Sequence, residues 1–393
     1  MGQTQFRSDD TNKWLEGFGD GSDGNGSINT STDAPIDSAC SGTVGTKSLT
    51  ATNASFAPGQ IILIHKTRGN TTVTAGSWEL NKIVAYSAGT ITLKYDLTHS
   101  YNSSGANASQ VLVMKQYNNL TINSAQTLTA KAWNGTVGGI IAYFVKGTAT
   151  VAGSINARGN NGSTGGGDAA GGVGAGFAGG MGRQGQRASY YGEGTSGASA
   201  SSSNGNANGN GGGGAKAKAP SNDGGSGGAG GHASAGGNGA TTPGGGQYYG
   251  IGGSAAGVAA LTTMVFGGGG GGSANGATEN SGASGGGAGG GIVLIISSTI
   301  IITGSINVRG GTSVTSYRGY SGGAGGSCLI KAKTATLGTN RINGTFQTAG
   351  VNASNGRIHL DYKTSYTGTT IPTLDATQDA TLGASTSNFF LMF

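Results

Sequence analysis

The chain has 393 residues, of which 84 are Gly, 5 are Pro, 22 are Lys or Arg and 16 are Asp or Glu, for a formal net charge of +6. The share of Gly is about three times the usual one, and the share of charged residues is well under half of the usual one. This composition excludes an average cytosolic enzyme domain. Collagen is excluded too, because the Gly residues keep no strict three-residue period and Pro is scarce.

Residues 1–45 are polar and rich in Gly, Asp, Ser and Thr, with a few apolar side chains at Phe6, Trp14, Leu15 and Phe18. This composition predicts an extended N-terminal arm. The first ten residues lack the basic and then apolar run of a secretory signal. We therefore expect a chain that stays where it is made or leaves by another route, either cell lysis and assembly on a virion or a bacterial secretion machine.

Residues 46–118 carry short apolar or alternating runs, separated by turn signals such as Pro58-Gly59 and Ala88-Gly89. Four or five strands at this spacing predict a small antiparallel β-barrel or sandwich. The runs are Ile61–Ile64, Leu80–Tyr86, Thr90–Tyr95 and Gln110–Met114.

An internal repeat follows. Residues 138–159 return 151 positions later at 289–310, and a looser third copy covers 325–333 and 341–347. Each copy has the form strand, polar corner, strand and Gly-Ser-Ile-Asn corner, which is typical of a β-solenoid because one coil cannot bury its apolar face alone. We expect first coils in 119–160, with 117–129 as a coil before the first copy, and further coils in 291–363.

The final segment, 364–393, is predicted to be a tail with an apolar end. The longest apolar stretch of the chain, Ile292–Ile302, is interrupted by Ser297, Ser298 and Thr299 and is shorter than the roughly 20 residues that a spanning helix needs. We therefore expect no membrane insertion. Cys40 and Cys328 have no metal or redox spacing and are interpreted as free, buried thiols.

Between the repeat copies, 52 of the 140 residues from Val151 to Gly290 are Gly. Such a tract is typical of a flexible linker, and its order would have to come from backbone hydrogen bonds between neighbouring segments. A left-handed three-residue helix of the polyproline II type points its N–H and C=O groups outward, and Gly lets such helices approach closely. We predict a polyglycine II helix bundle over 161–290, enclosed by the solenoid coils, in an all-β fold.

Catalytic signals are weak. The four His and four Glu residues are scattered without ligand spacing, and the predicted solenoid strands carry almost no acid for a glycosidase pair. Gly-x-Gly-x-x-Gly matches follow from the Gly content, and Asp20–Gly26 is interpreted as a polar turn rather than a calcium loop. The sequence predicts no enzyme, no cofactor and no metal. The thinly spread positive charge predicts no nucleic-acid partner.

Aromatic residues inside the Gly-rich sequence are the candidates for recognition. A Tyr pair flanked by Gly is expected in a turn between glycine helices, where its ring can stack on a sugar, although packing is the rival interpretation. The candidate receptor-binding residues are Tyr190, Tyr191, Tyr248, Tyr249, Tyr317 and Tyr320. Phe177 and Phe266 are expected to pack. Assembly contacts are expected from Phe6, Trp14, Phe389, Phe390 and Phe393.

The Gly-rich tract from Asn160 to Gly291 resembles the glycine-rich adhesin at the tip of long tail fibres in some tailed phages. In that family polyglycine helices form a sandwich whose loops contact the host receptor. The segments at 61–69, 78–83 and 322–333 are also similar to large Gly-rich surface or virion proteins of bacteria and phages. The resemblance covers about a third of the chain, which departs from the adhesin by adding a barrel and solenoid coils.

The resemblance implies a non-enzymatic virion structural protein of a tailed phage, in the tail fibre or tail tip. Its expected partners are a host glycan or outer-membrane receptor, other tail proteins and a second copy of the chain. The alternative is a structural subunit of an extracellular bacterial or archaeal filament or surface layer. A third hypothesis, an ice-binding protein, requires a flat Thr- or Ala-rich face.

Overall fold

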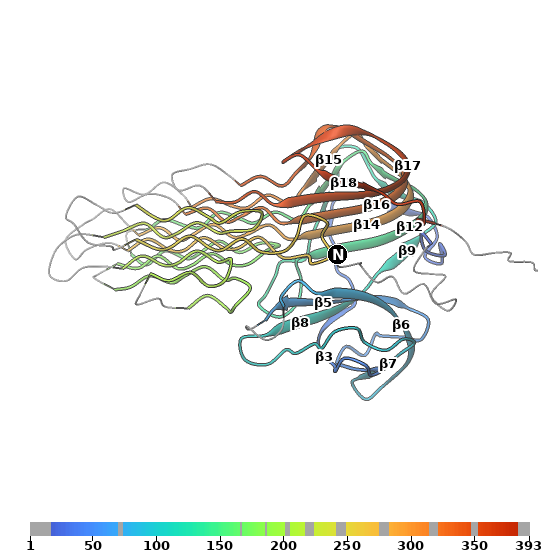
Figure 1. Cartoon of the computed structure of the whole chain (residues 1–393), viewed down its shortest axis with the longest axis horizontal. Helices are drawn as coiled ribbons and strands as arrows, with labels where there is room; N and C mark the ends of the chain where they lie inside the picture. The colour runs from blue at the N-terminus through green and yellow to red at the C-terminus, as the bar shows by residue number, and fades with distance from the viewer. Residues whose placement is uncertain are drawn as a thin grey trace, which may run out of the picture.

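The computed structural model describes residues 17–69, 74–165, 167–184, 187–200, 205–216, 224–240, 249–274, 283–313, 321–346 and 353–383. The fold is all-β, and none of these residues lies in a helix, so none forms a helix that could cross a membrane. Figure 1 shows three parts: a parallel β-sheet body, a smaller barrel beside it, and long Gly-rich runs that extend from one end of the body.

The barrel is closed and antiparallel, in the order β3-β4-β7-β6-β5-β8. The four predicted strand runs are confirmed as β5, β6, β7 and β8. Its interior is filled by a side-chain cluster that includes Ile62, Ile64 and Val111. The strands are β3 (Asp37–Ser41), β4 (Ser48–Ala51), β5 (Ile61–Arg68), β6 (Trp78–Ser87), β7 (Thr90–Leu93) and β8 (Ala108–Val113).

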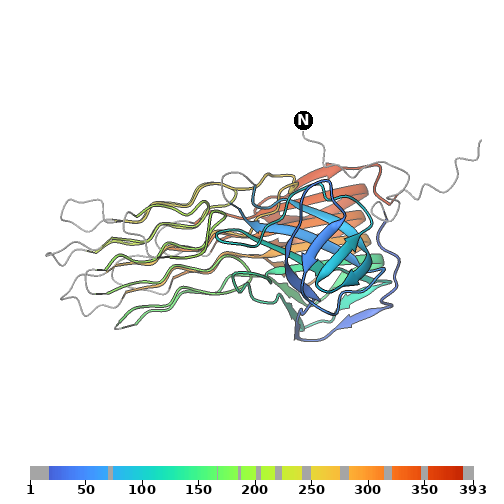
Figure 2. The same cartoon turned by 90° about the horizontal axis from the view of Figure 1, so that it is seen from below.

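The second part is a solenoid of parallel coils (Figure 2), in which each long strand pairs with the corresponding strand of the next coil. Inward-facing residues such as Ile141, Val293 and Ile330 form its core. Its strands are β1 (Gly26–Ile28), β2 (Ser31–Thr32), β9 (Lys115–Tyr117), β10 (Leu120–Ile122), β11 (Thr127–Thr129), β12 (Ile140–Val151), β13 (Ser154–Asn156), β14 (Ile292–Ile302), β15 (Ser305–Asn307), β16 (Ser327–Asn343), β17 (Arg357–Ile371) and β18 (Asp375–Gln378).

The predicted repeat appears directly in the register of the strands. Ser154 pairs with Ser305 and Asn156 with Asn307, an offset of 151 residues, and Asn343 of the third copy lies next to Asn307. Each of these Asn side chains accepts a hydrogen bond from the N–H two residues on, at Arg158, Arg309 and Thr345. The repeated Asn therefore fixes the corner at which the chain leaves the solenoid.

The expected boundaries need correction at both ends of the chain. The predicted arm of residues 1–45 contains β1 and β2, which form the first parallel coil by pairing with β10 and β11, and β3, which closes the barrel. The predicted tail from residue 364 contains the rest of β17 and all of β18. In both places the polar segment forms a strand because its backbone N–H and C=O groups pair with those of a neighbouring strand.

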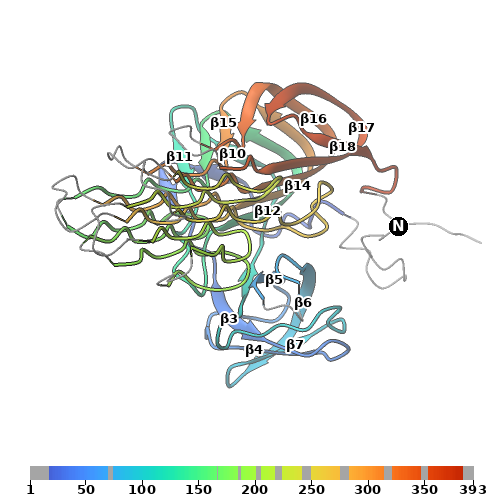
Figure 3. The same ribbon diagram turned by 60° about the vertical axis from the view of Figure 1, so that its left-hand side comes forward.

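The Gly-rich runs are not enclosed by the coils. They leave after β13 and β15, extend away from the body and return into β14 and β16, so that they continue the coils outward (Figures 1 and 3). We call the runs between residues 157 and 291, together with those at 308–326, the glycine bundle. The free cysteines Cys40 and Cys328 are both buried, as predicted.

Candidate functional site: the glycine bundle and its anchor

The centre of the glycine bundle is the run of residues 267–274, here called the central run. Its amides donate in turn to three different neighbouring runs and then return to the first, so the direction repeats every third residue. The donor–acceptor pairs are Gly267 to Gly290, Gly268 to Gly231, Gly269 to Glu193, Gly270 to Gly287, Gly271 to Gly228 and Gly272 to Tyr190, at 2.9 to 3.2 Å. Along each neighbouring run, successive acceptors are three residues apart.

The carbonyl groups of the central run face three further runs. Gly268 O accepts from Ala324 N, Gly269 O from Gly212 N, and Gly270 O from Gly180 N, at 2.7 to 2.9 Å. The central run therefore has six neighbours, three that accept from it and three that donate to it. The N–H groups of the central run are thus paired with backbone carbonyl groups, as buried backbone donors require.

Residues 267–272 of the central run must be Gly because their neighbours approach from every side. A Cβ added to Gly268, Gly269 or Gly271 would overlap a carbonyl oxygen of Asn210, Ala178 or Gly213, respectively. Runs at the surface of the bundle accept larger residues at every third position. Ala170 and Val173 are exposed in one such run, and Ile251 and Ser254 in another.

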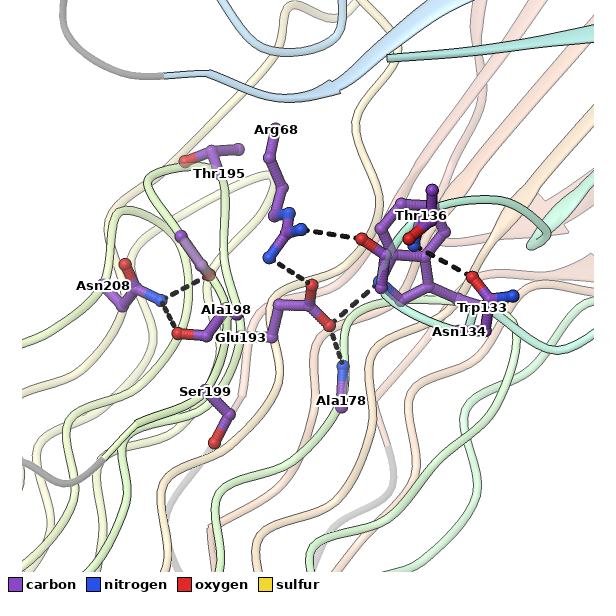
Figure 4. A network of polar contacts seen from close by, with 12 residues as sticks. Arg68, Trp133, Asn134, Thr136, Ala178, Glu193, Thr195, Ala198, Ser199 and Asn208 are labelled. Atoms are coloured by element: carbon purple, nitrogen blue, oxygen red, sulfur yellow. Dashed lines mark hydrogen bonds and ion pairs between the residues drawn. The ribbon is translucent and has the colours of Figure 1, made fainter. Parts of the chain in front are cut away.

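A buried ion pair anchors the bundle to the rest of the molecule (Figure 4). Arg68, at the end of barrel strand β5, lies 3.1 Å from Oε1 of Glu193 in the bundle, and both side chains are less than a tenth exposed. Oε2 of Glu193 accepts from Trp133 Nε1 at 2.9 Å and from Ala178 N at 3.1 Å. Arg68 also donates to Gly135 O at 2.7 Å. One carboxylate thus joins the barrel, the solenoid and the bundle.

The electrostatics of this anchor are those of a buried charge. Burial raises the pKa of Glu193, and the charge of Arg68 and the hydrogen bonds from Ala178 and Trp133 only partly oppose it. Removing charges from water costs roughly several kcal/mol per ion, so such a pair fixes one arrangement more than it adds stability. The anchor therefore defines how the bundle is oriented on the body.

Two buried histidines hold the base of the bundle. His65 Nε2, from the barrel, lies 2.9 Å from Met264 O, and His232 Nδ1 lies 2.7 Å from Gly325 O. A carbonyl can only accept, so these nitrogens carry the protons. Burial lowers the pKa of each histidine to about 4. Both rings are therefore neutral at pH 7.

An aromatic cluster fills the space at the base of the bundle. The rings of Phe177, Phe266 and Trp133 lie 5.3 to 6.4 Å apart with edge-to-face geometry. Both Phe side chains are fully buried. Their predicted packing role is confirmed.

The predicted recognition residues fall partly inside the described structure. Tyr190 and Tyr191 lie within a hydrogen-bonded run rather than in a turn, since Tyr190 N donates to Met181 O and Tyr190 O accepts from Gly272 N. The reason is that their backbone amides take part in the lattice like those of Gly. Both side chains, and that of Tyr249, are half-buried. Tyr248, Tyr317 and Tyr320 lie outside the described residues, as do Phe6, Trp14, Phe389, Phe390 and Phe393.

A small charged network begins at Tyr190. The Arg183 guanidinium lies 5.3 Å from the centre of its ring. Asp168 lies 3.4 Å from Arg183 Nε and 2.7 Å from Arg187 Nη2. This patch, made of Asp168, Arg183, Arg187 and Tyr190, has one more positive than negative charge. It offers an aromatic edge and guanidinium donors to a polar ligand.

Sequence reasoning missed the anchor. Glu193 stands alone in low-complexity sequence and Arg68 follows the predicted strand run Ile61–Ile64, and only the fold brings them together. Within the described ranges, no group of three or more His, Cys, Asp or Glu residues is placed to hold a metal ion. No protein-family model matches the sequence, and no curated protein is significantly similar to it.

Proposed function

We propose that the glycine bundle is a rigid polyglycine II-type scaffold that presents a binding surface at a distance from the β body. The observation that supports this proposal is the hydrogen bonding of the central run. Its N–H groups donate to three neighbouring runs in turn, with a period of three residues. A left-handed helix with three residues per turn has this periodicity. A scaffold held by its own backbone leaves the side chains at its surface available for recognition.

The function that fits such a scaffold is that of a non-enzymatic structural protein of a tailed-phage virion. In this proposal it is a component of the tail fibre or tail tip, the β body joins other tail proteins, and the bundle attaches to the host cell surface. The Tyr190 patch is the contact surface that the described residues offer, with a host glycan or outer-membrane receptor as its partner. The protein is carried on the virion after assembly in the host cytoplasm.

The test has two parts. Antibodies raised against the chain should label the tail end of the virion in electron micrographs, and purified chain should bind host cells and reduce phage adsorption. Arg187→Ala combined with Tyr190→Ala should weaken binding, whereas Val173→Ala, at an exposed position elsewhere on the bundle, should not. Labelled virions without cell binding would reject the adhesin role but keep the structural one.

The alternative is a subunit of an extracellular filament or surface layer. It is favoured by the last long strand, because β18 pairs with β17 only through residues His359–Tyr362 and leaves the rest of that described edge open to another strand. Removing residues 1–16 separates the two hypotheses without touching β1. A filament subunit would lose polymerisation, and a tail-tip adhesin would keep cell binding.

A further inference from the structure

A charged cluster on the last coils of the solenoid is not used by the proposed function. Lys331 on β16 and Asp361 on β17 are register partners in adjacent parallel strands. The Lys331 amine contacts Asp361 Oδ2 directly, and their side chains are only 7% and 14% exposed. On its other side Lys331 pairs with Ile296, which is also buried. The amine is therefore held against one carboxyl group in a largely apolar place.

The second oxygen of the same carboxyl group is held by a histidine. His359 Nε2 lies 3.0 Å from Asp361 Oδ1, and its Nδ1 lies 2.9 Å from Asp375 Oδ2 on β18. The His359 side chain is 2% exposed, whereas that of Asp375 is 48% exposed. Because a carboxylate oxygen accepts, the Nε2–H group of His359 can donate a hydrogen bond to Asp361 Oδ1, while the contact with Asp375 keeps the ring in place.

We propose that Lys331 and Asp361 form an intramolecular amide bond, an isopeptide cross-link between β16 and β17, with His359 as the group that promotes it. The cluster supplies a nucleophilic nitrogen, a carboxyl carbon and a hydrogen-bond donor on the oxygen where negative charge develops. These are the groups that amide formation needs, and the ladder of paired strands holds them in place.

The reaction balances without an oxidant or a further reactant. A proton first passes from the Lys331 ammonium to Asp361, which gives a neutral amine and a carboxylic acid. The Nζ–Cγ bond then forms while the His359 N–H stabilises Oδ1, and the Cγ–Oδ2 bond breaks. The hydroxyl that leaves takes the second proton from nitrogen and departs as one molecule of water. His359 is unchanged.

Burial favours the product over the ion pair. Two charges held away from water carry a large desolvation penalty, and the amide removes both of them. Before reaction, burial raises the pKa of Asp361, but hydrogen bonds and charge from His359 and Lys331 outweigh burial and hold that pKa below its ordinary value. The unreacted pair is therefore ionic, and proton transfer within it is the first step.

The proposed bond lies at the C-terminal end of the solenoid, where it would stabilise the last coils. Coils of a solenoid are held by their neighbours, and the terminal coil has a neighbour on one side only, so unravelling begins there. Among the described residues β17 is the last long strand, and β18 covers only part of it. A covalent link from β16 to β17 would fasten this end against mechanical or thermal opening, and it does not depend on which partner the glycine bundle binds.

Mass spectrometry of the full chain tests the proposal. The intact denatured protein should be lighter than its sequence by one water molecule, and a protease digest should contain one branched peptide that joins Lys331 to Asp361. Lys331→Arg and Asp361→Ala should each abolish the loss of water, so that each variant has the full mass calculated from its own sequence. Lys333→Arg, at an exposed position on the same strand, should keep the loss.

The digest matters because Asp-Gly pairs, such as Asp20-Gly21, can lose water by forming a succinimide. A loss of water that persists in Lys331→Arg, or separate unmodified peptides carrying Lys331 and Asp361, would overturn the proposal. His359→Gln should lower the cross-linked fraction measured at fixed times after purification, and an unchanged fraction would remove His359 from the mechanism.

Discussion

The solenoid and the glycine bundle are continuous in the chain, yet different groups hold them together. The solenoid buries Ile, Val and Leu side chains between its coils, as in Ile141, Val293 and Ile330. The first six residues of the central run, at 267–272, are all Gly and have no side chains, and the run is held by backbone bonds to six neighbours. The difference teaches that a Gly-rich segment can become ordered through its backbone amides alone, provided that no side chains separate the neighbouring runs.

Breaking the Arg68–Glu193 anchor should lower stability the most, because this anchor joins the glycine bundle to the β body. Arg68→Met leaves Glu193 buried without its countercharge and should lower the free energy of unfolding by about 3–5 kcal/mol. The double variant Arg68→Met/Glu193→Gln should lose less than the single one, as followed by chemical denaturation. Arg187→Met breaks a more exposed pair with Asp168 and should cost less than about 1 kcal/mol. Equal losses in all three variants would contradict this account.

Gly269→Ala tests the lattice itself. At an unstrained position Gly→Ala commonly stabilises a protein by about 0.4–1 kcal/mol, through the unfolded state. At Gly269 the added Cβ would overlap Ala178 O, so we expect a loss of about 2–3 kcal/mol, as for overpacking. Amide hydrogen exchange should become faster along the central run. Gly165→Ala is the matched control, because the nearest atom to its Cβ lies 3.9 Å away.

Acid should loosen the base of the bundle by a smaller amount. The folded pKa of His65 and of His232 is about 4, below the ordinary value of 6.5, so the unfolded chain binds more protons between these values. Stability is full above pH 6.5 and falls toward pH 4, by about 2 kcal/mol per histidine at pH 5. Denaturation at several pH values measures the slope. His65→Gln should make this slope shallower, because only His232 then contributes to it, and His99→Gln, at an exposed histidine, should leave it unchanged.

The sequence predicts much of the β body and less of the bundle. Alternating apolar residues mark the barrel strands, and the 151-residue repeat places β13 beside β15, because side chains encode these contacts. The Gly content predicts that backbone segments approach one another closely. Because Gly has no side chain, however, the sequence does not indicate which runs are neighbours. The central position of residues 267–274 is therefore visible only in the structure. The Arg68–Glu193 contact is missed for the same reason, since the lattice carries Glu193 to the barrel.

The neighbouring strands β12 and β14 have a kinetic consequence. Ile140 pairs with Ile292, 152 residues away, whereas Ile292 pairs with Ser327 only 35 residues away. Closing the longer loop costs about 1 kcal/mol more entropy, and distant contacts slow folding. We expect the C-terminal coils β14, β16 and β17 to assemble first and to serve as a template on which the earlier coils and the glycine runs are later laid down.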